Sequence, residues 1–307
     1  MIPHDVITSG SNPRVRQAAA LRDSDARRAT GLTLVDGRRE LSRAERAGVE
    51  IVELFIDADT VQQRGTTPAD GDGGPEFDRW AGALAAAGTR IVMLSGRAFE
   101  KVAFGSRNEG LVGVVRFQGR PLEELRADAT RPVLVVEGVE KPGNLGAILR
   151  TADAAGIAGV IVCDGRTDPA NPAVIRASLG TVFTMPLGIG PSAAAIEWCE
   201  RNVRRVVAAM PAGDRLWHES SLDGCTAILL GSEAHGLSPL WNDAGQRGTI
   251  RFESVRLPMA GVADSLNVSA TAAVLAYEAL RQRTAGRPPT AGSESKPGSK
   301  PGTTRKP

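Results

Sequence analysis

The sequence predicts an α/β protein with two domains, because short apolar runs rich in β-branched residues alternate with helical patterns along most of its 307 residues. A chain of this length can bury two sizeable cores. The composition, 42% hydrophobic and 23% charged, is typical of a soluble globular protein. No apolar stretch approaches the length of a membrane span, and no signal peptide is visible, so we expect a cytoplasmic protein.

The expected N-terminal α/β domain covers residues 1–118 and is followed by a linker at 119–131 that contains Gly, Pro and several charges. A Gly- and Asp-rich stretch at 60–74 indicates an insertion. The expected strands are 32–36, 51–56, 91–94 and 110–117, and the expected helices are 38–48 and 76–87.

The second domain is expected at 132–284, where strands and helices alternate, which predicts a mostly parallel sheet with helices on both faces. Residues 285–307 lack apolar periodicity and are expected to form a disordered basic tail. The expected strands are 133–137, 159–163, 182–186, 204–209, 226–231 and 255–257, and the expected helices are 144–155, 172–179, 192–201 and 266–283.

The net charge of +2 does not by itself indicate a nucleic-acid partner. Arginine is dense between Arg14 and Arg46, and the basic tail adds more cations. Guanidinium groups suit phosphate contacts, so these clusters either touch a nucleic-acid backbone or only reflect a chain that uses Arg for most of its cations. Cys163, Cys199 and Cys225 are scattered without a CxxC pair, which argues against a disulfide framework or a zinc site, and we expect no metal.

Two motifs follow predicted strands. After strand 133–137 comes a turn and then a helix that we expect to open at Asn144 and that carries Arg150 six residues later. After strand 226–231 comes a loop that runs from Gly231 to Gly236 with Glu233 and His235 inside it. Glycine at a strand's carboxyl end lets the backbone approach a ligand closely.

A third motif precedes the last helix, where Leu257, Pro258 and Met259 lead to the run Ser265-Leu-Asn-Val-Ser269. Small polar side chains at a helix start either cap backbone N–H groups or hold a ligand hydroxyl, and for Ser265 both interpretations stay open. There is no Gly-x-Gly-x-x-Gly after a strand, so a Rossmann-type methyltransferase or a dehydrogenase is not indicated.

Asn-x₅-Arg, Gly-x-Glu-x₂-Gly and Pro-Met followed by Ser-Leu-Asn-Val-Ser, in this order, resemble the three motifs of the SpoU (TrmH) family in the SPOUT superfamily. The resemblance covers about residues 133–281 and implies RNA ribose 2′-O-methylation with S-adenosylmethionine. It also implies a deep trefoil knot in the C-terminal domain and a homodimer joined through that domain, with the active site beside the interface. The opening residues 7–13 resemble the start of ribosomal RNA-binding domains that hold the substrate in this family.

The resemblance assigns catalytic roles to Arg150, Asn144, Ser265 and Asn267. Arginine is a poor base, so we expect Arg150 to bind a substrate phosphate, orient the hydroxyl and stabilise the developing alkoxide. His235 is a candidate base, although the family pattern does not require histidine there. Glu233 could also bond backbone N–H groups or a partner subunit. The residues expected to contact the cofactor are Leu230, Gly231, Glu233, Gly236, Leu257, Met259 and Leu266.

The whole α/β domain ahead of the motif region favours ribosomal RNA as the substrate, and we expect 23S ribosomal RNA. Two alternatives remain: a tRNA 2′-O-methyltransferase, and a catalytically silent RNA-binding or ribosome-assembly protein with the same fold.

Overall fold

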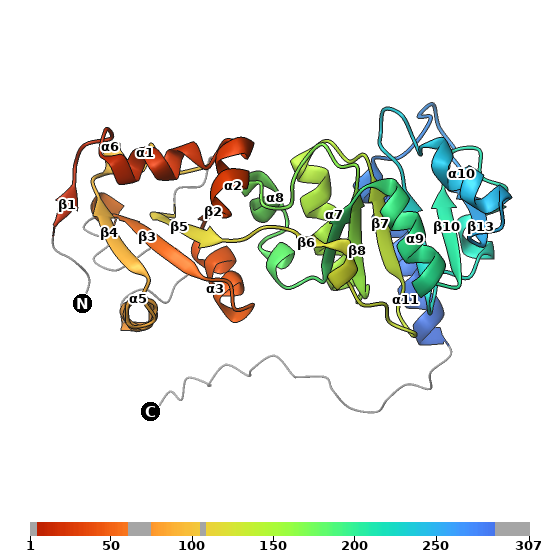
Figure 1. Cartoon of the computed structure of the whole chain (residues 1–307), viewed down its shortest axis with the longest axis horizontal. Helices are drawn as coiled ribbons and strands as arrows, with labels where there is room; N and C mark the ends of the chain where they lie inside the picture. The colour runs from red at the N-terminus through yellow and green to blue at the C-terminus, as the bar shows by residue number, and fades with distance from the viewer. Residues whose placement is uncertain (1–4, 61–74, 105–108, 286–307) are drawn as a thin grey trace, which may run out of the picture.

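The computed structural model describes residues 5–60, 75–104 and 109–285, which form two α/β lobes placed side by side (Figure 1). Apart from Thr60 and Ala285, the predicted insertion at 60–74 and the predicted basic tail lie outside the described residues. None of the helices in the described ranges combines the length and apolarity that crossing a bilayer requires.

The N-terminal lobe is a mixed five-stranded sheet with strand order β1-β4-β3-β5-β2. Strand β5 runs antiparallel to β3 and β2, and β3 runs parallel to β4. Helices α1 and α6 cover one face of the sheet, and α3 and α5 cover the other. The elements are β1 (Val6–Ile7), α1 (Pro13–Ala20), α2 (Ser24–Thr30), β2 (Leu32–Asp36), α3 (Arg38–Arg46), β3 (Ile51–Asp57), α5 (Pro75–Ala86), β4 (Arg90–Leu94), α6 (Gly96–Phe99) and β5 (Leu111–Arg116).

The C-terminal lobe is an eight-stranded sheet with order β11-β13-β10-β12-β7-β8-β9-β6, and every pairing in it is parallel. The strands are β6 (Arg120–Pro121), β7 (Val133–Glu137), β8 (Gly159–Cys163), β9 (Leu187–Gly190), β10 (Arg205–Ala209), β11 (Arg215–Leu216), β12 (Thr226–Leu230) and β13 (Phe252–Arg256). The α-helices are α7 (Pro142–Ala154), α8 (Pro172–Ala177), α9 (Ser192–Asn202), α10 (Pro239–Gln246) and α11 (Val268–Ala285). The predicted α/β class and parallel sheet are confirmed, and the knot stays a prediction.

Successive residues of each strand point to opposite faces, and β7, β8 and β12 are buried at every position, so both faces of the C-terminal sheet are covered there. On β7, Val133 and Val135 pack with residues of α9 and α10, whereas Leu134 and Val136 pack with residues of α7 and α11. The apolar cluster that contains Leu134 and Val136 continues into the N-terminal lobe, where it includes Leu41 of α3. The two lobes therefore share one continuous apolar core.

Helix α8 lies between the lobes and packs on α7 (Figure 1). The contact is close because α7 has glycine at position 146. A Cβ atom there would lie 2.4 Å from the Cβ of Ala177 and 2.8 Å from the backbone nitrogen of Ser178. Helix α7, which carries the first motif, is thus held directly against the helix that meets the N-terminal lobe.

The predicted strand at 182–186 is wrong. Residues Thr181–Phe183 form a buried 3-10 turn instead, and the sheet resumes at β9. The ring of Phe183 meets that of Phe117 edge-on, with centroids 4.9 Å apart. This run is apolar because the lobe interface buries it and not because it pairs in a sheet.

Helix boundaries also differ from the prediction. Helix α7 begins at Pro142 with Lys141 as its N-cap residue, so Asn144 lies inside the first turn and does not open the helix. Proline suits the first helical position because it has no N–H to satisfy. The short strand β6, which falls in the predicted linker, pairs with β9.

Candidate active site

The three motifs meet at the carboxyl edge of the C-terminal sheet. In a parallel sheet all strand ends of one kind lie on the same edge, so the loops that leave them are neighbours. Strand β12 lies between β7 and β10, and the register pairs Leu230 with Val136 on one side and with Ala209 on the other. The loops after β7 and β12 are therefore adjacent. Strand β10 separates the loop after β13 from the loop after β12.

Glu233 joins the three motifs through hydrogen bonds. Its Oε1 accepts from the Nδ2 of Asn144 and, at 2.8 Å, from the Nδ2 of Asn267. The same Asn267 Nδ2 lies 3.3 Å from the Oδ1 of Asn144. Lys141 Nζ stands 3.9 Å from Glu233 Oε2. The carboxylate of the second motif thus orients one amide from the first motif and one from the third.

Asn267 is also the residue that caps α11. Its Oδ1 accepts from the backbone N of Ser269 at 3.0 Å and from the Ser269 hydroxyl at 2.6 Å, and its carbonyl accepts from the N of Thr271 at 2.9 Å. These bonds to Oδ1 direct the Nδ2 toward Glu233. The capping role that was left open for Ser265 therefore belongs to Asn267.

The second motif forms a tight loop. Ser232 and Gly236 exchange two backbone hydrogen bonds of 3.0 Å each, and the N–H of His235 donates to the Ser232 hydroxyl. A Cβ at Gly231 would lie 2.4 Å from the carbonyl carbon of Gly236, so only glycine fits there. The imidazole of His235 is exposed and bonds to no other described residue.

A cavity of about 250 Å³ lies beside this cluster. Ser265 and all seven residues predicted to contact the cofactor line it. The cavity has two carboxylates, those of Glu233 and Asp264, and none of the described residues that line it is basic. The lining residues that the sequence reasoning missed are Ala209, Met210, Pro211, Ser232, Leu237, Asp264, Val268 and Thr271. Ala209 ends β10 and Met210 and Pro211 follow it, so these three could have been found only from the strand order, which places β10 beside β12.

Arg150 stands apart from the cavity. It is exposed on α7, six residues after Asn144, which corresponds to about 9 Å along the helix axis. Its guanidinium makes no hydrogen bond or ion pair to another described residue. The structure therefore brings Asn144, Ser265, Asn267 and Glu233 together and leaves Arg150 free to meet a group from outside the chain.

Glu137 holds the loop of the second motif in place through hydrogen bonds to Ser238. This role was not predicted from the sequence. This buried carboxylate at the end of β7 accepts from the N and Oγ of Ser238 at 2.7 and 2.8 Å, from Trp241 Nε1 at 3.1 Å, and from the hydroxyl of Ser192. Ser238 lies two residues after Gly236, the end of the second motif, and is the N-cap residue of α10. Glu137 therefore fixes the outgoing end of the loop that lines the cavity.

Comparison with known proteins agrees with this arrangement. Residues 131–277 match the SpoU rRNA Methylase family, and residues 12–113 match the MRM3-like substrate binding domain. The chain is 34% identical over 209 residues to the 23S rRNA (guanosine-2′-O-)-methyltransferase RlmB of Vibrio cholerae, which covers 65% of this chain and 81% of that protein. It is 30% identical over 289 residues to the 23S rRNA (uridine(2479)-2′-O)-methyltransferase of Streptomyces viridochromogenes, covering 91% and 93%.

Solved structures show the same two-lobed fold. A crystal structure of an RNA 2′-O ribose methyltransferase superposes with a TM-score of 0.74 at 35% identity, covering 91% of this chain and 99% of that one. The AdoMet-bound rRNA methyltransferase of Sinorhizobium meliloti superposes with a TM-score of 0.76 at 26% identity, covering 91% and 98%. The ordered motifs, their convergence on one cavity and these similarities lead to one conclusion: the chain belongs to the SpoU family of rRNA methylases.

Proposed function

We propose that this chain transfers a methyl group from S-adenosylmethionine to a ribose 2′-hydroxyl of 23S ribosomal RNA in the cytoplasm. The observation that carries the proposal is the cluster of Asn144, Glu233 and Asn267 at the rim of a cavity that Leu257, Met259 and Leu266 line with apolar side chains. Relatives that cover most of the chain are named as 23S rRNA 2′-O-methyltransferases. One is named for guanosine and the other for uridine, so the nucleotide stays open.

The cavity fits S-adenosylmethionine better than a nucleotide cofactor. Its apolar walls suit an adenine ring, and the close approach at Gly231 leaves backbone groups to recognise it. The sulfonium and the amino group of S-adenosylmethionine outweigh its single carboxylate, and this net positive charge matches a lining with two carboxylates and no basic side chain among the described residues. The phosphates of a nicotinamide dinucleotide would meet Glu233 and Asp264, and none of the described lining residues is a cation that could bind them.

When bound, S-adenosylmethionine supplies an electrophilic methyl group, and the protein must hold the ribose oxygen in line with it. We assign this positioning to Asn144, Asn267 and Ser265. The two amides are themselves held by Glu233, so they present fixed donors and acceptors to the hydroxyl. Arg150 would bind the neighbouring phosphate and stabilise negative charge on the oxygen as the hydroxyl proton passes to solvent water, the proton acceptor in this scheme. No conventional base is needed in this scheme, and His235 has no assigned role.

We also propose a homodimer joined through the C-terminal domain. Four exposed large apolar side chains of the described residues lie in this domain, at Leu240, Val262, Leu266 and Tyr277. Leu266 and Val262 belong to the loop beside the cavity, so a second copy packed there would lie next to the site. Such a copy would also account for the distance between Arg150 and the cavity of its own chain. Light scattering at micromolar concentration should give twice the chain mass, and a monomer mass would contradict the proposal.

The decisive test is transfer of a labelled methyl group from the cofactor to total RNA, followed by mapping of ribose methylation. Wild type should label one position of 23S RNA. Arg150→Ala should abolish transfer while it leaves cofactor affinity unchanged, and Asn267→Ala should lower the rate. Label in a tRNA would overturn the substrate assignment, and cofactor binding without transfer to any RNA would favour a silent RNA-binding protein.

A further inference from the structure

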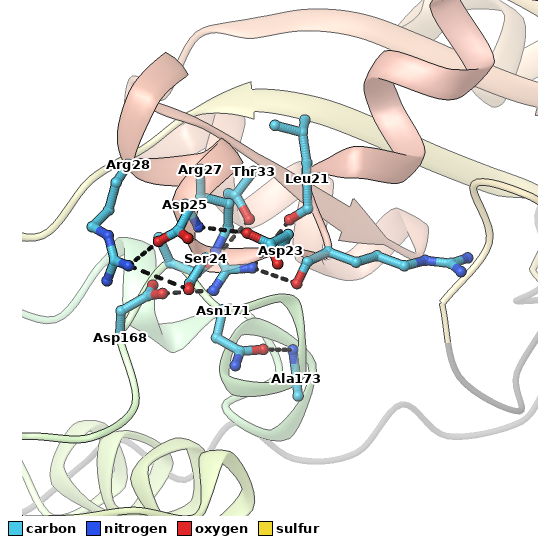
Figure 2. A network of polar contacts seen from close by, with 12 residues as sticks. Leu21, Asp23, Ser24, Asp25, Arg27, Arg28, Thr33, Asp168, Asn171 and Ala173 are labelled. Atoms are coloured by element: carbon cyan, nitrogen blue, oxygen red, sulfur yellow. Dashed lines mark hydrogen bonds and ion pairs between the residues drawn. The ribbon is translucent and has the colours of Figure 1, made fainter.

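Arg27 of the N-terminal lobe is buried at the lobe interface, with its side chain only 5% exposed. Its Nη2 pairs with Asp168 Oδ2 of the C-terminal lobe at 2.6 Å, and its Nη1 donates to the carbonyls of Leu21 and Arg22 at 3.1 and 2.8 Å. Figure 2 shows this guanidinium reaching from α2 to Asp168. A buried guanidinium needs its counter-ion, so the pair ties α2 to the second lobe.

Asp168 lies in the segment 164–171, which leaves β8 and leads into α8, and a second bond joins this segment to the N-terminal lobe. The hydroxyl of Thr33 on β2 donates to the carbonyl of Ala170 at 2.5 Å. Asn171 then caps α8 by accepting from the N of Ala173 at 2.9 Å. One short segment thus holds both a helix and a strand of the other lobe.

The same segment contacts the turn that precedes the first motif. The N–H of Arg166 donates to the carbonyl of Val139 at 3.1 Å, and its guanidinium pairs with Glu140 at 3.0 Å. The turn 138–141 leads directly into α7, which carries Asn144 and Arg150. Polar contacts joined by short stretches of backbone therefore connect Arg27 to the motif helix.

Two polar atoms of the pair remain unused. Arg27 Nε and Asp168 Oδ1 are buried and have no hydrogen-bond partner within the described part of the chain. They are one donor and one acceptor on residues that are already joined, so closing a second arm would satisfy both. The pair makes one contact in this structure and has the donor and the acceptor for a second.

We propose that Arg27 and Asp168 are positioning residues that hold the substrate-binding lobe at a set distance from α7, so that RNA gripped by that lobe presents one ribose to the cavity. The proposal rests on the proposed function. Arg27, although it belongs to the Arg14–Arg46 cluster, then has a role inside the protein and does not contact RNA. Both residues act through α7 and the segment 164–171 and touch neither substrate nor cofactor.

The test compares Asp168→Asn with the matched control Asp25→Asn, using an unmodified transcript of 23S RNA. Asp25 pairs with Arg28 on the same helix, but both side chains are at least 70% exposed, so this control removes the same kind of group where screening makes it unimportant. A displaced lobe misplaces the ribose, so kcat of Asp168→Asn should fall at least about tenfold. Affinities for cofactor and for RNA should match wild type, as should all values for the control.

The double variant Arg27→Met/Asp168→Asn should be no worse than Arg27→Met alone, because the two residues act as one unit. Thr33→Val, which removes the neighbouring bridge, should also lower kcat and serves if Asp168→Asn does not fold. A fall in the fraction of molecules that bind cofactor, in place of a fall in kcat, would mean a purely structural role and overturn the proposal. Normal kcat values in both Asp168→Asn and Thr33→Val would also overturn the proposal. No methyl transfer by wild type would instead overturn the proposed function, and the positioning role with it.

Discussion

Glu137→Gln tests whether a single buried carboxylate holds the second motif in place. In the wild type, Oε2 accepts from the N–H of Ser238, and Oε1 accepts from Ser192, Ser238 and Trp241. Glutamine keeps an oxygen for those three donors but turns its own NH₂ toward the Ser238 N–H, so that buried donor loses its partner. One lost bond to a charged acceptor costs about 1.5–3 kcal/mol, and the orphaned donor adds about 1–3 kcal/mol.

Relief of the buried charge offsets part of this cost, and we expect a net loss of about 2–3 kcal/mol in the free energy of unfolding. For a lobe of this size, that loss lowers the melting temperature by roughly 4–12 °C. Thermal melts followed by tryptophan fluorescence suit the test, because Trp241 is one of the affected donors. Glu140→Gln, whose carboxylate is exposed and paired with an exposed Arg166, should melt within about 1 °C of wild type. Identical melting of Glu137→Gln and wild type would refute the account of this cluster.

Three further predictions concern other parts of the chain. Gly231→Ala should weaken cofactor binding in calorimetry by about 1–3 kcal/mol, because the new Cβ would collide with Gly236. Gly82→Ala is the control and should bind the cofactor normally, because its new Cβ would meet no atom within 4 Å. Burial raises the pKa of Asp36 to about 7 from an ordinary 3.8, against the opposing effect of Arg176. The folded chain then keeps this proton between about pH 4 and 7, so the free energy of unfolding should fall by up to roughly 4 kcal/mol as pH rises through that window, and denaturant titrations of Asp36→Asn should lack this fall. Burial raises the pKa of the Cys163 and Cys199 thiols to about 12, so mass spectrometry after mild alkylation should find Cys225 modified first, and early labelling of the buried pair would contradict their placement.

Much of the fold could be predicted because local patterns carry it. The run Val133–Glu137 is mostly β-branched and is apolar up to its last residue, and the strand has these bounds in the structure. The predicted strand at 182–186 failed because Val182 and Phe183 are buried by the other lobe, which no local pattern records. Contacts such as that between Asn267 and Glu233 depend on the order of strands in the sheet, and that order is set by pairings between distant segments.

The candidate site shows the same division. Glycine at 231 and 236 and the small polar residues at 265–269 point to a loop and a helix start that approach a ligand, and both line one cavity. The contribution of β10 could not be read because nothing near Met210 marks it as a neighbour of β12. Arg27 belongs to a basic cluster for which RNA contact was one interpretation, yet its side chain is buried against Asp168. The sequence could not show this, because a buried charge needs a partner and here the partner comes from the other lobe.

The apolar core that runs unbroken through both lobes has a consequence for how such a protein can change its target. A lobe that shares its interior with its neighbour cannot be exchanged like a detachable module, because a transplanted one would expose Leu41 and its neighbours or meet a surface that does not fit them. New RNA specificity would therefore have to arise by point changes on the outer surface of the substrate-binding lobe, while the residues facing α8 stay as they are. Chimaeras that join the lobes of two relatives should aggregate unless both parents have matching residues where the two lobes pack together.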